Sequence, residues 1–114
     1  MLALAAGVAT TASAQHHAIP IYATNRNPAV KALFVQNVDV RSGWSCTAVP
    51  SNGQTTTLAP VLVNSRFIVI GFGTTDCRFG TEVRGLNRPG FKVADVFQVF
   101  IDVYNNNNGI QVLQ

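Results

Sequence analysis

The sequence is poor in charged residues, which make up 11% of the chain, against about 25% in typical soluble domains. Hydrophobic residues make up 47%, so the chain has enough apolar surface to bury and does not have the composition of a disordered protein. A nucleic-acid-binding surface needs a dense basic stripe, and we therefore expect no nucleic-acid partner. The basic residues are instead spread out, as Arg26, Lys31, Arg41, Arg66, Arg78, Arg84, Arg88 and Lys92.

Groups for catalysis are also scarce. The two histidines are neighbours near the N-terminus, His16 and His17, and no G-x-S-x-G motif is present, which argues against a serine hydrolase. Glycoside hydrolysis needs two carboxyl groups that act as a pair. Nothing in the sequence indicates that any two of the five acidic residues form such a pair. We therefore expect a protein that is not an enzyme. The acids are Asp39, Asp76, Glu82, Asp95 and Asp102.

The only cysteines are Cys46 and Cys77, and they lack the C-x-x-C spacing of a zinc or redox motif. In an oxidising compartment such a pair forms a disulfide. The alternative is two separate buried thiols in a cytosolic protein.

The first fourteen residues are apolar and end in Ala12-Ser13-Ala14, small residues that a signal peptidase accepts. They lack the positive n-region of a secretory signal, so we expect the true start to lie upstream. The stretch is too short to span a membrane, which takes about 20 residues. We expect a signal peptide over 1–14, a mature domain over 15–114, and a periplasmic or extracellular location. The alternative is an Ala-rich helix that belongs to the fold.

After residue 15, short alternating segments are separated by turn residues, and no segment has a helical period with caps. This pattern predicts an all-β fold, a single-domain antiparallel β-sandwich of seven or eight short strands with one disulfide. Pro20 suggests an edge position for the first strand, and residues 67–70, apolar on both faces, suggest a central one. The expected strands are 19–24, 30–40, 44–49, 54–58, 61–72, 77–84, 91–104 and 110–113.

Three of these segments have faces that can be assigned from alternation. In 30–40, Ala32 and Phe34 share one face with Val38 and Val40. In 77–84, Cys77, Phe79, Thr81 and Val83 point one way, and residues 85–90 read as a turn. The segment 91–104 has the clearest pattern, with one apolar face formed by Phe97, Val99, Ile101 and Val103.

Several short motifs come in an order shared with a known group of proteins: Asn25, an apolar strand through Leu33 and Val35, then Trp44, Leu58-Ala59-Pro60 and Cys77-Arg78-Phe79. In this the chain resembles small bacterial periplasmic β-sandwich domains of unknown function. Those domains have Gly after the Trp, Gly after the Pro and Asp after the aromatic residue, where this chain has Ser45, Val61 and Gly80. The resemblance implies export and a sandwich fold, and it carries no catalytic residues.

Three aromatic residues are candidates for ligand contact. Trp44 lies close to Cys46, which favours packing over the disulfide in the core, and the alternative is an exposed anchor for a sugar or a partner. Phe100 and Tyr104 share the less apolar face of 91–104. We expect a second packed sheet to cover them, and the alternative is an exposed interface patch.

The histidines offer a copper site only at a processed N-terminus. Cleavage after Ala14 would leave Gln15-His16-His17, whose amine, two amides and His17 imidazole form a square-planar set for Cu²⁺ or Ni²⁺. Cleavage after Gln15 would leave His16 to chelate copper with its own amine and ring. No third histidine supports either site, so a polar leader without cofactor is the favoured interpretation.

The sequence thus predicts an exported, non-enzymatic binding or structural module of the cell envelope, without a transmembrane span. The alternative function is a copper- or carbohydrate-binding accessory protein that uses the histidines or exposed aromatics. Its partner is another envelope protein, or a second copy that pairs through an edge strand, for which the polar segment 54–58 is the candidate.

Overall fold

The computed structural model describes residues 17–40, 43–106 and 109–114. These residues form strands and no helix, which confirms the all-β prediction. The expected signal peptide and its cleavage site lie outside the described residues. The strands are β1 (Ala18–Ile19), β2 (Ile21–Asn25), β3 (Ala32–Asn37), β4 (Trp44–Ala48), β5 (Thr55–Thr57), β6 (Val61–Leu62), β7 (Arg66–Phe72), β8 (Glu82–Lys92), β9 (Val99–Val103) and β10 (Ile110–Leu113).

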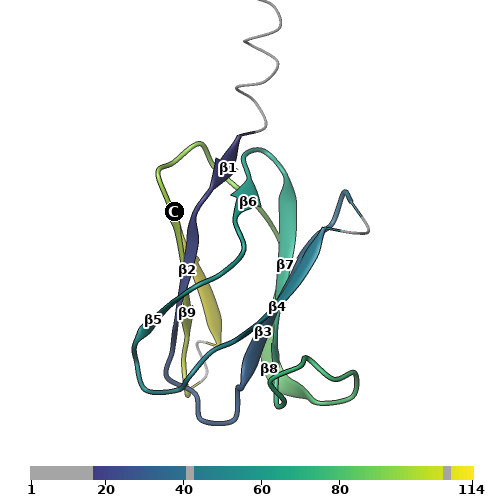
Figure 1. Cartoon of the computed structure of the whole chain (residues 1–114), viewed down its shortest axis with the longest axis vertical. Coiled ribbons are helices and arrows are strands. Elements are labelled where there is room, and N and C mark those ends of the chain that lie inside the picture. Colours follow the sequence, from purple (N-terminus) through teal and green to yellow (C-terminus); the bar gives the residue numbers. More distant parts are fainter. Residues whose placement is uncertain (1–16, 41–42, 107–108) are drawn as a thin grey trace, which may run out of the picture.

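Two four-stranded sheets face each other across the core, with strand orders β10-β9-β2-β5 and β4-β3-β7-β8 (Figure 1). The short β1-β6 ladder lies at one end and joins the segments that enter β2 and β7. Each strand buries alternate apolar residues, and both sheets contribute to a single core cluster. Its fully buried members include Ile21, Val99, Ile101, Val103, Leu33 and Val69.

One ladder differs from the antiparallel prediction. β2 and β9 run parallel, with Ile21 opposite Val99 and Asn25 opposite Val103. Because β2 lies between β9 and β5, it is an inner strand, and the edge position expected from Pro20 is wrong. Pro20 instead separates β1 from β2, where the chain leaves its pairing with β6 and begins to pair with β5 and β9. Its carbonyl accepts a hydrogen bond from Val99 at 3.0 Å.

In β3, Ala32 and Phe34 share one face as expected, but the opposite face is the one that points into the core. Leu33 and Val35 point into the core, whereas Phe34 lies half-buried on the outer face. The strand ends at Asn37, whose side-chain oxygen accepts a hydrogen bond from Asp39 N at 2.8 Å. The chain turns there, so the two later valines, Val38 and Val40, lie outside the strand and are exposed.

The segment 73–92 contains the largest error in strand position. Residues 77–81 form a loop, in which Cys77 (φ 53°) and Gly80 (φ 94°) have left-handed backbones. The predicted turn 85–90 lies within β8. This strand tolerates Gly85 and Pro89 because it is at the sheet edge and two register shifts against β7 absorb the extra residues.

The predicted long strand 91–104 is interrupted. β8 ends at Lys92, residues 93–98 form a loop, and β9 begins at Val99. Val99, Ile101 and Val103 are buried as predicted, but Phe97 is in the loop and 96% exposed. Phe97 continues the apolar alternation of β9, so the pattern by itself does not show that the strand begins only at Val99.

Other predictions are confirmed. β5 is an edge strand within 54–58, and β7 lies between β3 and β8. Trp44 and Cys46 share one face of β4, and the expected strand 110–113 is present as β10, which pairs with β9.

Asn25 ties the two sheets together at the end of β2. Its side chain is 1% exposed. The amide nitrogen donates to Val30 O at 2.9 Å and to Val49 O at 3.2 Å, while the amide oxygen accepts from Asn27 N at 2.9 Å. Val30 leads into β3 and Val49 follows β4, so one side chain joins the end of one sheet to two strands of the other.

Candidate functional site

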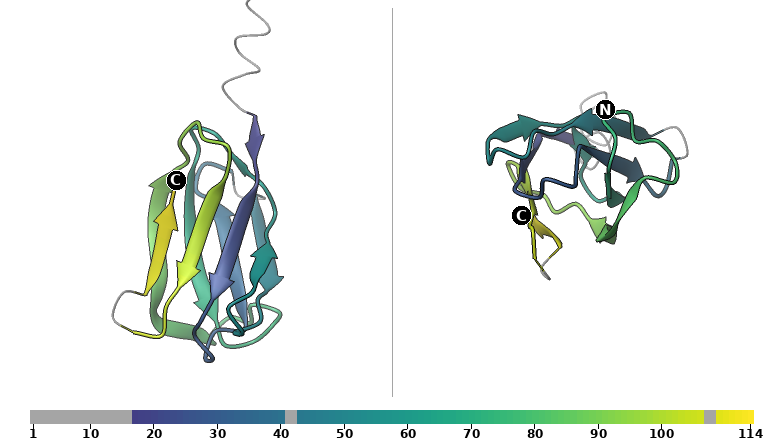
Figure 2. Two further views of the ribbon diagram at one scale, coloured as in Figure 1. Left: turned by 90° about the vertical axis from the view of Figure 1, so that its left-hand side faces the viewer. Right: turned by 90° about the horizontal axis from the view of Figure 1, so that it is seen from below.

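The outward face of the β10-β9-β2-β5 sheet collects the side chains best suited to bind a ligand. Ile21 of β2 and Ile101 of β9 point into the core. Side chains alternate along a strand, so the neighbours of these two residues in each strand point outward. Figure 2 shows this sheet in its left view, with its strands side by side at the front of the molecule. We call this surface the outer platform: Tyr22, Thr24, Thr55, Thr57, Phe100, Asp102, Tyr104, Gln111 and Leu113.

One half of the outer platform is apolar. The parallel pairing places Tyr22 opposite Phe100, with ring centroids 5.6 Å apart. Leu113 follows on the next strand, opposite Phe100. A hollow of about 350 Å³ extends this half towards the loop 93–98, where it is lined by Val96 and Phe97. This half of the outer platform is therefore a candidate binding region.

The other half is polar and organised around Asp102. The Tyr104 hydroxyl donates to Asp102 Oδ2 at 3.2 Å, and Arg26 Nη1 lies 4.0 Å from Asp102 Oδ1. Thr24 lies opposite Asp102 and Thr55 opposite Thr24. The Asp102 side chain keeps 20% of its surface exposed, so it remains accessible at the face.

The surroundings of Tyr104 favour its neutral form. Desolvation raises the pKa of the Tyr104 phenol, and the hydrogen bond to Asp102 and the negative charge of that carboxylate raise it further. The phenol therefore stays protonated further into alkaline solution than an ordinary tyrosine, and it remains a hydrogen-bond donor to Asp102.

Phe100 and Tyr104 share one face, as predicted, but no second sheet among the described residues covers them. Both are half-buried, and the two large sheets of the described chain use their other faces for the core. Sequence reasoning did not include Tyr22 and Arg26 in this site, and their approach to β9 depends on a parallel ladder between distant segments.

Trp44 lies elsewhere, on the outer face of the β4-β3-β7-β8 sheet. It is 58% exposed and stacks on Phe34 with centroids 5.7 Å apart. The favoured core interpretation is therefore wrong. Cys46 shares the face of Trp44, so the disulfide also lies outside the core.

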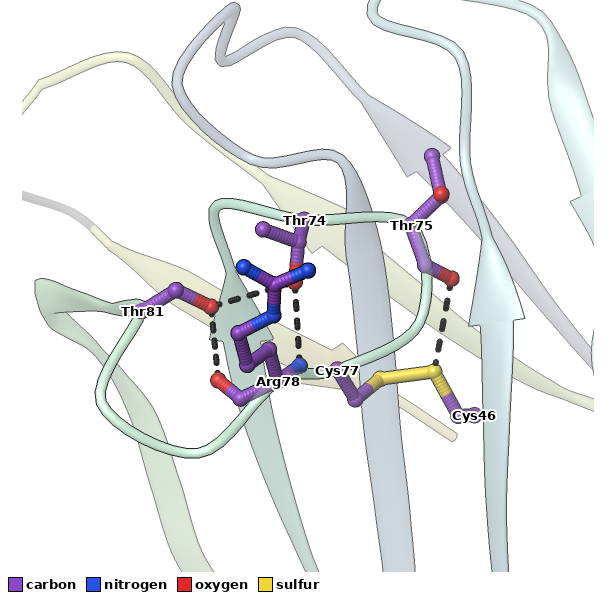
Figure 3. The surroundings of a disulfide bond; sticks show 6 residues. All are labelled: Cys46, Thr74, Thr75, Cys77, Arg78 and Thr81. Atoms are coloured by element: carbon purple, nitrogen blue, oxygen red, sulfur yellow. Dashed lines mark hydrogen bonds between the residues drawn. A yellow bond between two sulfur atoms is a disulfide. The ribbon is translucent and has the colours of Figure 1, made fainter.

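The Cys46–Cys77 disulfide is present and fastens the loop after β7 to strand β4 (Figure 3). Within this loop, Thr74 Oγ1 accepts from Arg78 N at 2.9 Å, and Thr81 Oγ1 donates to Arg78 O at 2.7 Å. The loop presents Phe79, which is 89% exposed. The disulfide therefore organises a loop on the face opposite to the outer platform.

The histidine site is only partly visible. His16 lies outside the described residues, and His17 Nε2 lies 3.6 Å from Asp95 Oδ1. Residues 17–40, 43–106 and 109–114 contain no group of three metal-ligating side chains.

Comparison of the chain with protein-family models, curated proteins and solved structures gave no match. Within the part of the chain that the structure describes, no helix is long and apolar enough to cross a membrane. The outer platform is therefore the candidate functional site of this chain.

Proposed function

We propose that this chain is an exported, non-enzymatic β-sandwich module of the cell envelope that binds neutral polysaccharide chains through the outer platform. The observation that carries the proposal is the position of the Tyr22–Phe100 pair beside the hydrogen-bonded Asp102 group. Pyranose rings present C–H groups on their faces and hydroxyls around their rims. Aromatic rings suit the former, and carboxylate, hydroxyl and guanidinium groups suit the latter.

The shape of the outer platform favours an extended ligand. It is an open face across four strands that lie about 4.8 Å apart, whereas small molecules bind in concave sites that enclose them. Its charges favour a neutral ligand, because the carboxylate of Asp102 has the guanidinium of Arg26 beside it. The other polar members are uncharged threonine, tyrosine and glutamine side chains.

Alanine substitutions of the aromatic pair test this proposal. We expect Tyr22→Ala and Phe100→Ala each to weaken binding about tenfold, the equivalent of one aromatic contact. The measurement is affinity electrophoresis in gels that contain a soluble β-glucan, xylan or galactomannan, followed by calorimetry with oligosaccharides of the retained polymer.

Trp44→Ala is the matched control, because it removes an exposed aromatic ring from the other sheet. It should leave retardation unchanged. Retardation by none of the three polymers, or an equal loss in Trp44→Ala, would contradict the proposal.

Export is supported by the disulfide, which persists in oxidising compartments, together with the signal-like residues 1–14. Native mass spectrometry of the protein recovered from its producing cells tests it. We expect a mature chain that begins at Gln15 and gains two hydrogens on reduction. An unprocessed chain with two free thiols would argue against export.

A further inference from the structure

Strand β4 has an open edge of hydrogen-bonding groups. Two backbone bonds, Asn37 N to Gly43 O and Val49 N to Lys31 O, lie at either end of its ladder with β3. Along an antiparallel ladder, every second residue forms backbone hydrogen bonds to the neighbouring strand. In β4 these residues are Ser45 and Thr47, whose backbone N–H and C=O groups point towards β3. The N–H and C=O groups of Trp44, Cys46 and Ala48 therefore point away from the sheet, and no backbone partner for them exists among the described residues.

The other sheet edges of the described chain are shorter or guarded. β8 carries Arg84, Arg88, Pro89 and Lys92 and has two register shifts, features that discourage strand pairing. β5 has only three residues. β10 also contacts β8 of the other sheet, and Arg88 lies beside it. β4 has five residues, with no charge and no proline.

An apolar groove lies beside this edge. It has a volume of about 210 Å³ and lies between the Gly43–Ser45 end of β4 and the segment 59–62. Val35, Val61 and Phe67 line it, and it contains no charged residue. A strand placed along β4 would direct alternate side chains towards this groove.

We propose that β4 binds an extended peptide segment of a partner protein as an added strand, with an uncharged apolar side chain of that segment in the groove. The free groups of Trp44, Cys46 and Ala48 supply the main-chain hydrogen bonds, and the groove selects the side chain. The outer platform is on the other sheet, so this interaction is independent of polysaccharide binding.

The test uses a display library of random twelve-residue peptides selected on the disulfide-bonded protein, and then the best peptide made synthetically. We expect selected peptides to carry uncharged apolar residues at alternate positions. Binding of the peptide should slow hydrogen exchange at the amides of Trp44, Cys46 and Ala48.

Ala48→Pro removes one outward N–H without removing a bond to β3, so it should weaken peptide binding about tenfold. Its thermal unfolding should match that of the wild type, which shows that the fold is kept. Tyr22→Ala on the other sheet is the matched control and should bind the peptide normally.

Three results would overturn the proposal: no enrichment of peptides, equal binding to Ala48→Pro, or unchanged exchange at the three amides. Sedimentation of the protein alone provides a further test. A wild-type dimer that Ala48→Pro converts to a monomer would show that the occupant is a second copy instead of a partner peptide.

Discussion

Replacing both Cys46 and Cys77 with serine is expected to lower the free energy of unfolding by about 3.7 kcal/mol. The disulfide joins residues with a sequence separation of 31, and the chain-entropy relation for a loop of this length gives that value. The crosslink acts mainly by restricting the unfolded chain, so the loss does not depend on contacts in the core. For a domain of this size, such a loss is a large fraction of total stability.

Urea denaturation of the double-serine variant measures this effect. Phe79→Ser is the matched control, because Phe79 lies in the same loop and is exposed, and such surface substitutions change stability by about 0.5 kcal/mol or less. The core residues lie between the sheets, away from the disulfide, so the variant should keep its β-sheet circular dichroism spectrum. Equal stability of the double-serine variant and the wild type would contradict the expected role of the crosslink.

The second large effect is expected at Asn25. Asn25→Ala should destabilise the fold by about 3 kcal/mol, because it removes three buried hydrogen bonds worth about 1 kcal/mol each. The carbonyls of Val30 and Val49 lose their donor, and the amide of Asn27 loses its acceptor. No apolar side chain of similar shape satisfies these groups.

Asn52→Ala is the control that distinguishes the effect of burial at Asn25 from the effect of its local turn hydrogen bond. Asn52 makes the same local bond, accepting from Gln54 N at 3.0 Å, but in an exposed loop. Its loss should cost less than about 1 kcal/mol. If thermal or urea unfolding gives equal losses for the two variants, the connection between the sheets at Asn25 does not contribute as proposed.

Some of the candidate site can be found from the sequence. The alternation of Val99, Ile101 and Val103 places Phe100, Asp102 and Tyr104 on the opposite face, because the period of a strand is local. The polar character of 54–58 indicates an edge strand in the same way. Tyr22 and Arg26 were missed because their place beside β9 depends on a parallel pairing between the first and last parts of the chain.

By itself, the sequence determined that the chain is all-β and that Cys46 and Cys77 are its only partners for a disulfide. It also determined that residues 67–70 lie inside a sheet. Composition, turn residues and local alternation carry this information. Only the tertiary structure decided which face of β3 is buried, that Trp44 and Phe97 are exposed, and that β4 keeps an open edge. These features depend on where one sheet ends and the other covers it, which is set by contacts between residues far apart in the chain.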